Sequence, residues 1–260
     1  MSGPLVTYAL NEGVARIALN DPDSLNAATE EMGLELLEML RKAAGEARAV
    51  LLTGEGRAFC SGANLTGAQD LLDDPMRDGG EQLETAFNPV IEKMRRIEQP
   101  VVTSVRGAVA GIGCGMAMAG DMIVCSDNAY FFQAFCHVGL VPDGGSSWLL
   151  SKAIGRVRAM RLMLLGEKLA AADAQEWGLV SMVVPDADLD TEAMALAKRL
   201  AAGPRSLAMI KKMAWDALES DLTDALATER RFQCEASRSD DFVEGVHAFS
   251  ERRPPSFKGR

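Results

Sequence analysis

Short apolar runs alternate with amphipathic segments along the first two thirds of the chain. Residues 5–10 and 14–19 are rich in apolar side chains and flank Asn11-Glu12-Gly13, which predicts an opening β-hairpin. This alternation at short intervals predicts an α/β fold made of stacked ββα-like units. Further buried strands are predicted at residues 49–53, 101–105, 122–125 and 130–133.

Helical periodicity begins at Thr29, where a capping residue and two glutamates precede apolar residues at helical spacing. Residues 86–97 and 111–119 are also expected to be helical. Residues 69–84 are rich in acids and are expected to form a mobile surface loop. From Ser146 onward helices dominate, and we expect one strand there, at residues 180–184.

The last quarter of the chain predicts helices alone. One helix, at residues 190–202, ends before Gly203-Pro204, and two apolar stripes follow it. Helices this amphipathic fit against the core or against a neighbouring subunit. We therefore expect a core over residues 1–200 and a helical region over residues 201–260. The stripes consist of Leu207, Ile210, Met213, Ala214 and Leu218, and of Leu222, Ala225, Leu226 and Phe232.

Composition and charge narrow the class of protein. With 48% hydrophobic and 25% charged residues among 260, the chain is typical of a globular protein. A net charge of −10 disfavours nucleic acid as a partner, and an anionic ligand would need a local basic patch. The five cysteines form no CxxC pair, and His137 and His247 lie far apart, so we expect reduced thiols and no metal site. Without a signal-peptide pattern or an apolar stretch long enough to cross a bilayer, we expect a cytoplasmic protein with no membrane partner.

Two glycine-rich segments could approach a ligand closely through their backbone amides. Residues 57–65 follow a predicted strand, and taken alone they are typical of an ordinary turn between a strand and a helix. Residues 106–115 place glycines at the start of a helix, which suits anion binding and tight helix–sheet packing equally well. Their spacing, at Gly107, Gly111 and Gly113, is not the dinucleotide-binding fingerprint.

Asp143 stands between Pro142 and two glycines, ahead of an apolar helical run. Turn formation and capping of the following helix are the commoner roles for such an aspartate. The alternative is a carboxylate in an apolar pocket, where burial raises its pKa and makes it a base. His137 lies nearby in an apolar run, where a lone histidine is more often a packed core residue.

Taken together and in this order, the segments resemble the crotonase (enoyl-CoA hydratase/isomerase) superfamily over essentially the whole chain. The resemblance implies a crotonase-like fold with a C-terminal helical trimerisation region, assembled as a homotrimer or a dimer of trimers. It implies an acyl-CoA thioester as substrate and no separate cofactor, since coenzyme A is part of that substrate. The matching pieces are Ser24-Leu25-Asn26-Ala27, AFCSGANL (58–65), GAVAGIGCGMAMAGD (107–121), GLVPDGGSSWLL (139–150), Leu165-Gly166-Glu167, Glu176-Trp177-Gly178-Leu179-Val180 and the basic tail from Arg252.

The resemblance also assigns roles to residues. The N–H groups of Ala63 and Ile112 would hold the thioester oxygen as it becomes an enolate. Lys258 would reach the 3′-phosphate of coenzyme A from a neighbouring subunit. The other coenzyme A contacts carried over are Arg57, Ala58, Cys60, Ser61, Asn64 and Leu65.

Hydratases of the family hold a water between two glutamates, at positions where this chain has Gly115 and Phe135. Asp143 stands where isomerases often place their base, and its segment is especially similar to the phenylacetate-pathway branch. We therefore expect an acyl-CoA isomerase that shifts a double bond, or rearranges an aryl epoxide, through a thioester enolate. Candidate acyl-site residues are Met116, Phe135, His137, Trp148 and the loop near Leu71-Leu72.

Three alternatives stay open at this point. An enoyl-CoA hydratase would need a second polar group near Asp143, and His137 is the nearby candidate. A homologue that binds acyl-CoA without catalysis would keep the fold and the coenzyme A contacts. Nucleophilic attack by Asp143, as in the family's aryl-CoA dehalogenases, is the third.

Overall fold

A computed structural model describes residues 3–65, 74 and 76–260. Part of the acidic loop predicted at residues 69–84, and the pair Leu71-Leu72, lie outside the described residues. In the described part of the chain, no helix has both the length and the apolar character needed to cross a membrane.

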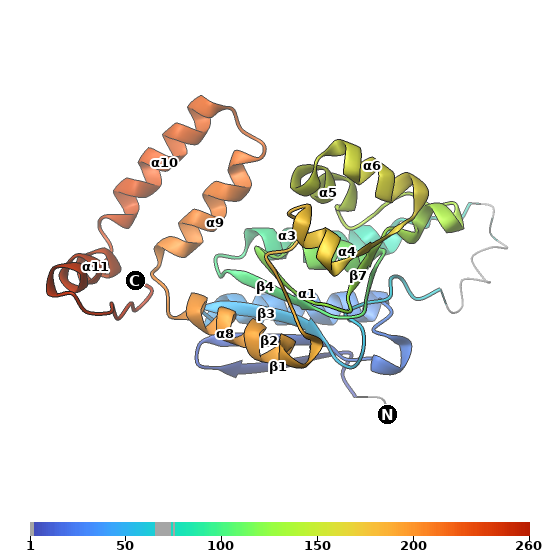
Figure 1. The fold of residues 1–260 in the computed structure, drawn as a ribbon, viewed down its shortest axis with the longest axis horizontal. Coiled ribbons are helices and arrows are strands. Elements are labelled where there is room, and N and C mark those ends of the chain that lie inside the picture. Colours follow the sequence, from blue (N-terminus) through green and yellow to red (C-terminus); the bar gives the residue numbers. More distant parts are fainter. Residues whose placement is uncertain (1–2, 66–73, 75) are drawn as a thin grey trace.

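One large sheet runs through the molecule, with the strands in the order β1-β2-β3-β4-β6-β9 (Figure 1). The predicted hairpin is confirmed, because β1 and β2 pair antiparallel, and all later neighbours in this sheet pair in parallel. Its strands are β1 (Val6–Asn11), β2 (Val14–Leu19), β3 (Ala49–Gly54), β4 (Val101–Val105), β6 (Met122–Ser126) and β9 (Met182–Val184).

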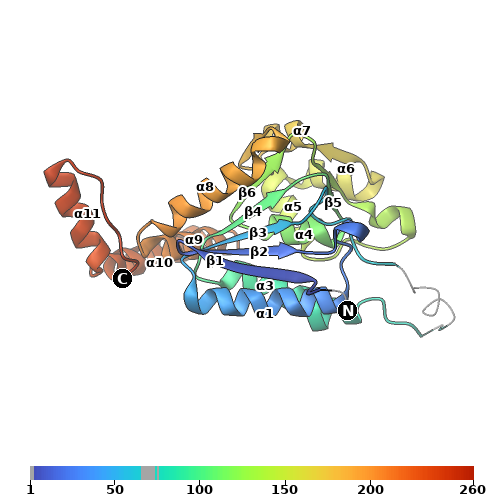
Figure 2. The ribbon, with the colours of Figure 1, turned by 90° about the horizontal axis from the view of Figure 1, so that it is seen from below.

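Helices cover both faces of the large sheet (Figure 2). On one face lie α1 (Glu30–Glu46), α3 (Asn88–Arg96) and α4 (Ile112–Met118), and on the other lies α8 (Leu189–Ala201). Because helices cover both faces in the middle of the sheet, every residue of β3 and β4 is buried, including the polar Thr103 and Ser104 of β4. The Thr29 hydroxyl accepts a hydrogen bond from Met32 N at 3.2 Å and so caps α1, as predicted.

A second sheet has the order β5-β7-β8. The expectation of one strand after Ser146 was wrong, because two strands, β8 and β9, lie there. β8 has three residues, of which Leu169 alone is buried, so it is too short to leave an alternating pattern. The strands are β5 (Ala108–Ala110), β7 (Tyr130–Phe132) and β8 (Lys168–Ala170). Two helices, α5 (Ser146–Ile154) and α6 (Arg156–Leu165), lie between β7 and β8 in the chain, and α7 (Ala171–Glu176) follows β8. Short helical turns are η1 (Pro22–Ser24), η2 (Leu83–Phe87), η3 (Ala134–Val138) and η4 (Asp186–Asp188).

Three helices form an arm that extends to one side of the sheets (Figure 1). They are α9 (Ser206–Ala217), α10 (Leu222–Ala236) and α11 (Asp240–Glu251). α9 buries Met209 and Lys211, whereas α10 buries none of its residues. Leu222, on the second predicted apolar stripe, is 75% exposed, so in a single chain α10 leaves this stripe largely uncovered.

Candidate active site

Three segments meet at the start of α4: the loop after β3, the turn from β5 into α4, and the turn that carries Asp143. A Cβ built on Gly111 would lie 3.5 Å from the Cα of Gly62, so the first two segments touch through their backbones. A Cβ on Gly115 would overlap the carbonyl oxygen of Gly144 and lie 2.9 Å from its carbonyl carbon, so the third segment rests directly on α4. Glycine is required at position 115 because no side chain fits between the two backbones, whereas Gly111 has room for a Cβ but a φ of +51° that favours glycine.

Asn26 holds the loop after β3 in place. Its side chain is fully buried, and its Oδ1 accepts a hydrogen bond from Asp21 N at 2.8 Å. Its Nδ2 donates to Glu55 O at 3.0 Å and to Ala58 O at 2.9 Å, at the two ends of the turn that follows β3. The sequence places Asn26 in a family motif but assigns it no role, since no local pattern shows which distant carbonyls a buried amide will meet.

The N–H groups of Ala63 and Ile112 are free in the described part of the chain. The neighbouring groups on the loop are used, because Ala28 N donates to Gly62 O at 2.8 Å and Asn64 N donates to Ala28 O at 2.9 Å. Ile112 is the first residue of α4, so its N–H has no partner within the helix. The two amides follow the contacting glycines Gly62 and Gly111, so the predicted pair of donors lies on adjacent backbone segments.

Asp143 sits in a tight turn in which Gly144 and Gly145 have φ values of +56° and +73°. Ser146 N donates to Asp143 O at 2.9 Å and closes the turn. The capping role was wrong: Gly145 is the N-cap of α5, and no side chain caps that helix. Instead, Asp143 Oδ1 is buried and has no hydrogen-bond partner among the described residues. Burial raises the pKa of Asp143 to about 6, although a hydrogen bond to its own backbone opposes the shift.

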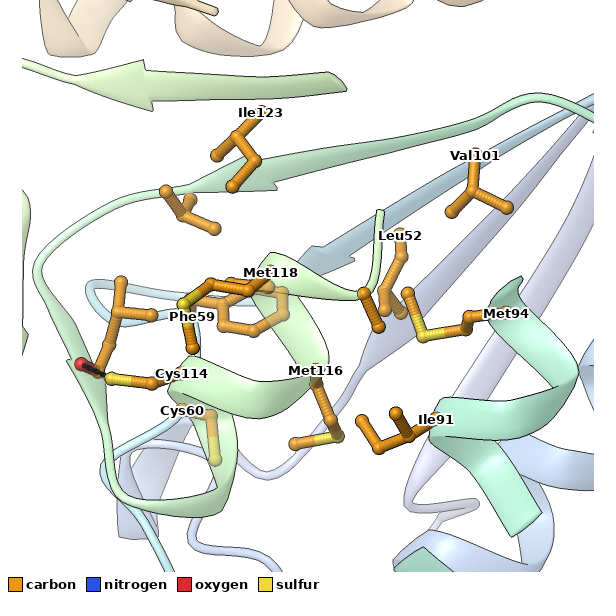
Figure 3. Packing of buried hydrophobic residues seen from close by; sticks show 14 of the residues in the cluster. Leu52, Phe59, Cys60, Ile91, Met94, Val101, Cys114, Met116, Met118 and Ile123 are labelled. Carbon is orange, nitrogen blue, oxygen red and sulfur yellow. Dashed lines mark hydrogen bonds between the residues drawn. The ribbon is translucent and has the colours of Figure 1, made fainter. Parts of the chain in front are cut away.

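Two buried thiols lie close enough to Asp143 to feel its charge. Burial raises the pKa of Cys60 to about 11 and that of Cys114 to about 12, and the Asp143 carboxylate adds to both shifts. Cys114 Sγ donates to Val109 O at 2.9 Å, and both thiols lie within the hydrophobic core (Figure 3). They are therefore neutral at pH 7. Cys60 is 0% exposed, and its N–H and C=O pair with Ala108 O and Ala110 N, so the structure gives this residue no group free for a ligand.

Phe135 stands at the predicted oxyanion hole. A Cβ on Gly111 would lie 3.7 Å from the Cζ of Phe135, and this ring is 8% exposed. Met116 is 1% exposed and points toward Ile91 of α3 within the core (Figure 3). Of these two candidates for the acyl site, the structure therefore places Phe135 beside Gly111, next to the predicted oxyanion hole, and packs Met116 in the core.

Two other candidates for the acyl site contact different parts of the chain. The ring of Trp148 stacks on Trp215 of α9 with centroids 6.3 Å apart. His137 is exposed, and its Nε2 lies 3.0 Å from Gly166 O at the end of α6. The ring contact accounts for Trp148 as a packing residue. His137 is exposed and contacts Gly166, so the expectation of a packed core histidine was wrong. The helical pattern could not show this for Trp148, because it does not reveal which distant helix covers α5.

The candidate residues for coenzyme A divide between the loop and the tail. On the loop, Arg57 is exposed and Leu65 is 60% exposed, whereas Ala58 is buried. Ser61 is anchored, with its N–H donating to Leu25 O at 3.0 Å, and Asn64 is half-buried. Lys258 is exposed on the tail after α11 and, within one chain, belongs to the arm rather than to the loop.

Comparisons with known proteins identify the family of this chain. A sequence profile of the enoyl-CoA hydratase/isomerase family matches residues 9–260. The chain is 42% identical to a "Probable enoyl-CoA hydratase" of Rhodobacter capsulatus over 100% of both chains. It is 39% identical to the 1,2-epoxyphenylacetyl-CoA isomerase of Escherichia coli, over 96% of this chain and 97% of the other. A solved structure of a family member from Mycobacterium abscessus is 34% identical and superimposes with a TM-score of 0.94, covering 98% of this chain and 100% of that one. The chain therefore belongs to the enoyl-CoA hydratase/isomerase family, the crotonase superfamily, as its motifs predicted.

Proposed function

We propose that this protein is an acyl-CoA isomerase that moves a double bond, or rearranges an aryl epoxide, through a thioester enolate. The observation that carries the proposal is the buried carboxylate of Asp143, with no partner for its Oδ1 among the described residues, beside the free amides of Ala63 and Ile112. Because Oδ1 has no structural partner, it is available to exchange a proton with a substrate. The 39% identical relative from Escherichia coli, which bears the name of an isomerase, also supports an isomerisation.

The reaction proposed for a Δ3-enoyl thioester uses one carboxylate twice. The thioester oxygen accepts hydrogen bonds from Ala63 N–H and Ile112 N–H, each of which lowers the barrier by about 2.7–4 kcal/mol in comparable sites. Asp143 removes a proton from C2, and the electron pair delocalises into the thioester as a dienolate. The same carboxyl group then returns the proton at C4, which leaves the double bond between C2 and C3. This proton transfer from C2 to C4 needs no electron acceptor, metal or second substrate.

Two features of the site disfavour hydration. Gly115 and Phe135 occupy the positions where hydratases of the family hold water with glutamates, and the backbone of Gly144 fills the space next to Gly115. The Phe135 ring beside Gly111 would displace water from the hole. Hydration of a Δ2-enoyl thioester stays the second candidate, because the 42% identical relative from Rhodobacter capsulatus bears the name of a hydratase.

Coenzyme A binding and assembly belong to the same proposal. The loop from Ala58 to Leu65 binds the adenine and pantetheine parts, and the 3′-phosphate is met by Arg57 and by Lys258 of a neighbouring subunit. The exposed apolar residues of the arm supply the contact that brings this neighbour close. The active species is then a trimer or a pair of trimers.

A substrate screen with product identification tests the reaction. Δ3-enoyl, Δ2-enoyl and aryl-epoxide CoA thioesters are offered to the wild type, and we expect isomerised rather than hydrated products. Asp143→Asn should keep acyl-CoA binding but lose at least 10²–10⁴-fold in isomerisation and stop exchange of C2 protons with heavy water. His137→Ala, in the packing contact with Gly166, should lose far less. Wild-type activity of Asp143→Asn on every active substrate would refute the mechanism.

A further inference from the structure

We propose that Gly115 is a positioning residue, whose missing side chain lets the turn of residues 142–145 rest on α4 and sets the depth of the Asp143 carboxylate in the site. A side chain at position 115 and a seated Asp143 are then mutually exclusive. This inference rests on the proposed role of Asp143. Gly115 then helps to determine the class of reaction, although it is not one of the reacting groups.

The contact between Gly115 and Gly144 consists of backbone on both sides. A Cβ on Gly115 would lie 2.9 Å from the carbonyl carbon and 3.0 Å from the Cα of Gly144, besides its overlap with the carbonyl oxygen. A flexible side chain could rotate away from such a contact, but a peptide group moves only with its turn. Any residue other than glycine at position 115 therefore lifts the turn away from α4.

The turn has little freedom to absorb this displacement locally. Gly144 has a φ of +56°, and a Cβ on it would lie 2.5 Å from Ile112 Cδ1. The hydrogen bond from Ser146 N to Asp143 O, 2.9 Å long, ties the start of the turn to α5. Because Asp143 directly precedes Gly144, a displacement of the Gly144 peptide moves the carboxylate outward, toward water.

The surroundings of Asp143 make its depth measurable. The titratable groups that feel its charge are the thiols of Cys60, on the loop after β3, and Cys114, on α4, and both are neutral at pH 7. Burial is the leading cause that raises the pKa of Asp143 to about 6. Its pKa therefore reports how far the turn has lifted, and this readout does not depend on catalysis.

The test is an NMR titration of aspartate carboxyl carbons, with Asp143→Asn assigning the signal. Gly115→Ala should move the pKa of Asp143 from about 6 toward its ordinary value of 3.8 and should lower isomerisation by about 10²-fold. Gly33→Ala is the matched control: this helical glycine on α1 is also crowded, with a Cβ 2.9 Å from that of Ala86, but lies away from the turn. The control should leave the pKa of Asp143 unchanged.

A folded Gly115→Ala protein with the wild-type pKa and activity would overturn the inference. If Gly115→Ala does not fold, Gly145→Ala replaces it. Its Cβ would have ordinary space, 3.5 Å from Leu149 Cδ1, but its φ of +73° strains the turn. An unchanged pKa of Asp143 in that variant also overturns the inference. Failure of the proposed function is seen separately, as an Asp143→Asn protein that still isomerises.

Discussion

Asp121 and Lys211 form an ion pair, with 2.9 Å between Oδ2 and Nζ, and their side chains are only 17% and 5% exposed. Asp121 Oδ1 accepts a second hydrogen bond, from Trp215 Nε1 at 2.8 Å. Lys211 Nζ also donates to Met94 O at 2.8 Å and to Gln99 O at 3.0 Å. Since Lys211 and Trp215 both belong to α9, this network fastens the arm to the sheet.

Removing the ammonium from this network should be costly. Lys211→Met leaves the largely buried Asp121 carboxylate without its counter-ion, so we expect the free energy of unfolding to fall by about 3–5 kcal/mol. Lys212→Met is the matched control, because Lys212 pairs with Asp216 at 2.8 Å on the exposed side of the same helix. That change should cost about 0–1 kcal/mol. Urea denaturation measures the free energy of unfolding of both variants, and equal losses would contradict the role given to the buried ion pair.

Ile112 offers a way to delete one oxyanion donor without touching a side-chain acid. Proline is tolerated at the first position of a helix, which Ile112 occupies in α4, and it has no N–H. Ile112→Pro should therefore fold but lose about 10²–10³-fold in turnover. Ile112→Ala keeps the amide and removes a similar buried volume, so it should retain most of its turnover. Equal turnover of the two variants would remove Ile112 N–H from the mechanism.

The buried carboxylate should weaken the fold at neutral pH. Burial raises the pKa of Asp143 in the folded state to about 6, from 3.8, so the folded state holds this proton more tightly than the unfolded state. The contribution to stability is therefore present below pH 4 and is lost as the pH rises through 6. Asp143→Asn should be more stable than wild type by about 1–3 kcal/mol at pH 8. Urea denaturation at pH 8 and pH 4 should show this gain disappear at the lower pH.

The basic tail should set the affinity for coenzyme A. The tail after residue 251 carries Arg252, Arg253, Lys258 and Arg260 on a protein of net charge −10. Lys258→Ala should weaken binding of free coenzyme A and flatten its dependence on salt, because one charge contact with a phosphate is lost. Arg260→Ala, a neighbouring exposed cation, serves as the control. Unchanged affinity and salt dependence on calorimetric titration would exclude Lys258 from the site.

The exposed apolar residues of the arm should be covered in solution. Leu222 is 75% exposed and Phe249 is 86% exposed in the single chain, which is unusual for large apolar side chains on neighbouring helices. Light scattering at micromolar concentration should therefore give the mass of a trimer or of a multiple of it. Leu222→Asp together with Phe249→Asp should shift the protein to smaller species. A monomeric wild type would contradict both the assembly and a coenzyme A site shared between subunits.

Much of this molecule could be predicted from its sequence, and the failures have physical causes. The apolar run at residues 49–52 and the valines of residues 101–105 predicted β3 and β4, because strands buried on both faces need few polar positions. The role of Asp143 depended on whether its carboxylate capped α5, and only the turn geometry decides that. The sequence shows Gly115 only as the absence of a glutamate, because its contact with Gly144 joins segments far apart in the chain. Local patterns carry no information about such contacts.

The order of strands in the large sheet has a consequence for the growing chain on the ribosome. From β1 to β9, each strand of this sheet pairs with the sheet strand that precedes it in the chain, so the strands lie side by side in the order of their synthesis. Every new strand can therefore add to an open edge as it emerges, and none has to insert between two strands that are already paired. A nascent chain paused between β6 and β9 carries a shortened copy of the finished sheet rather than a rearranged one.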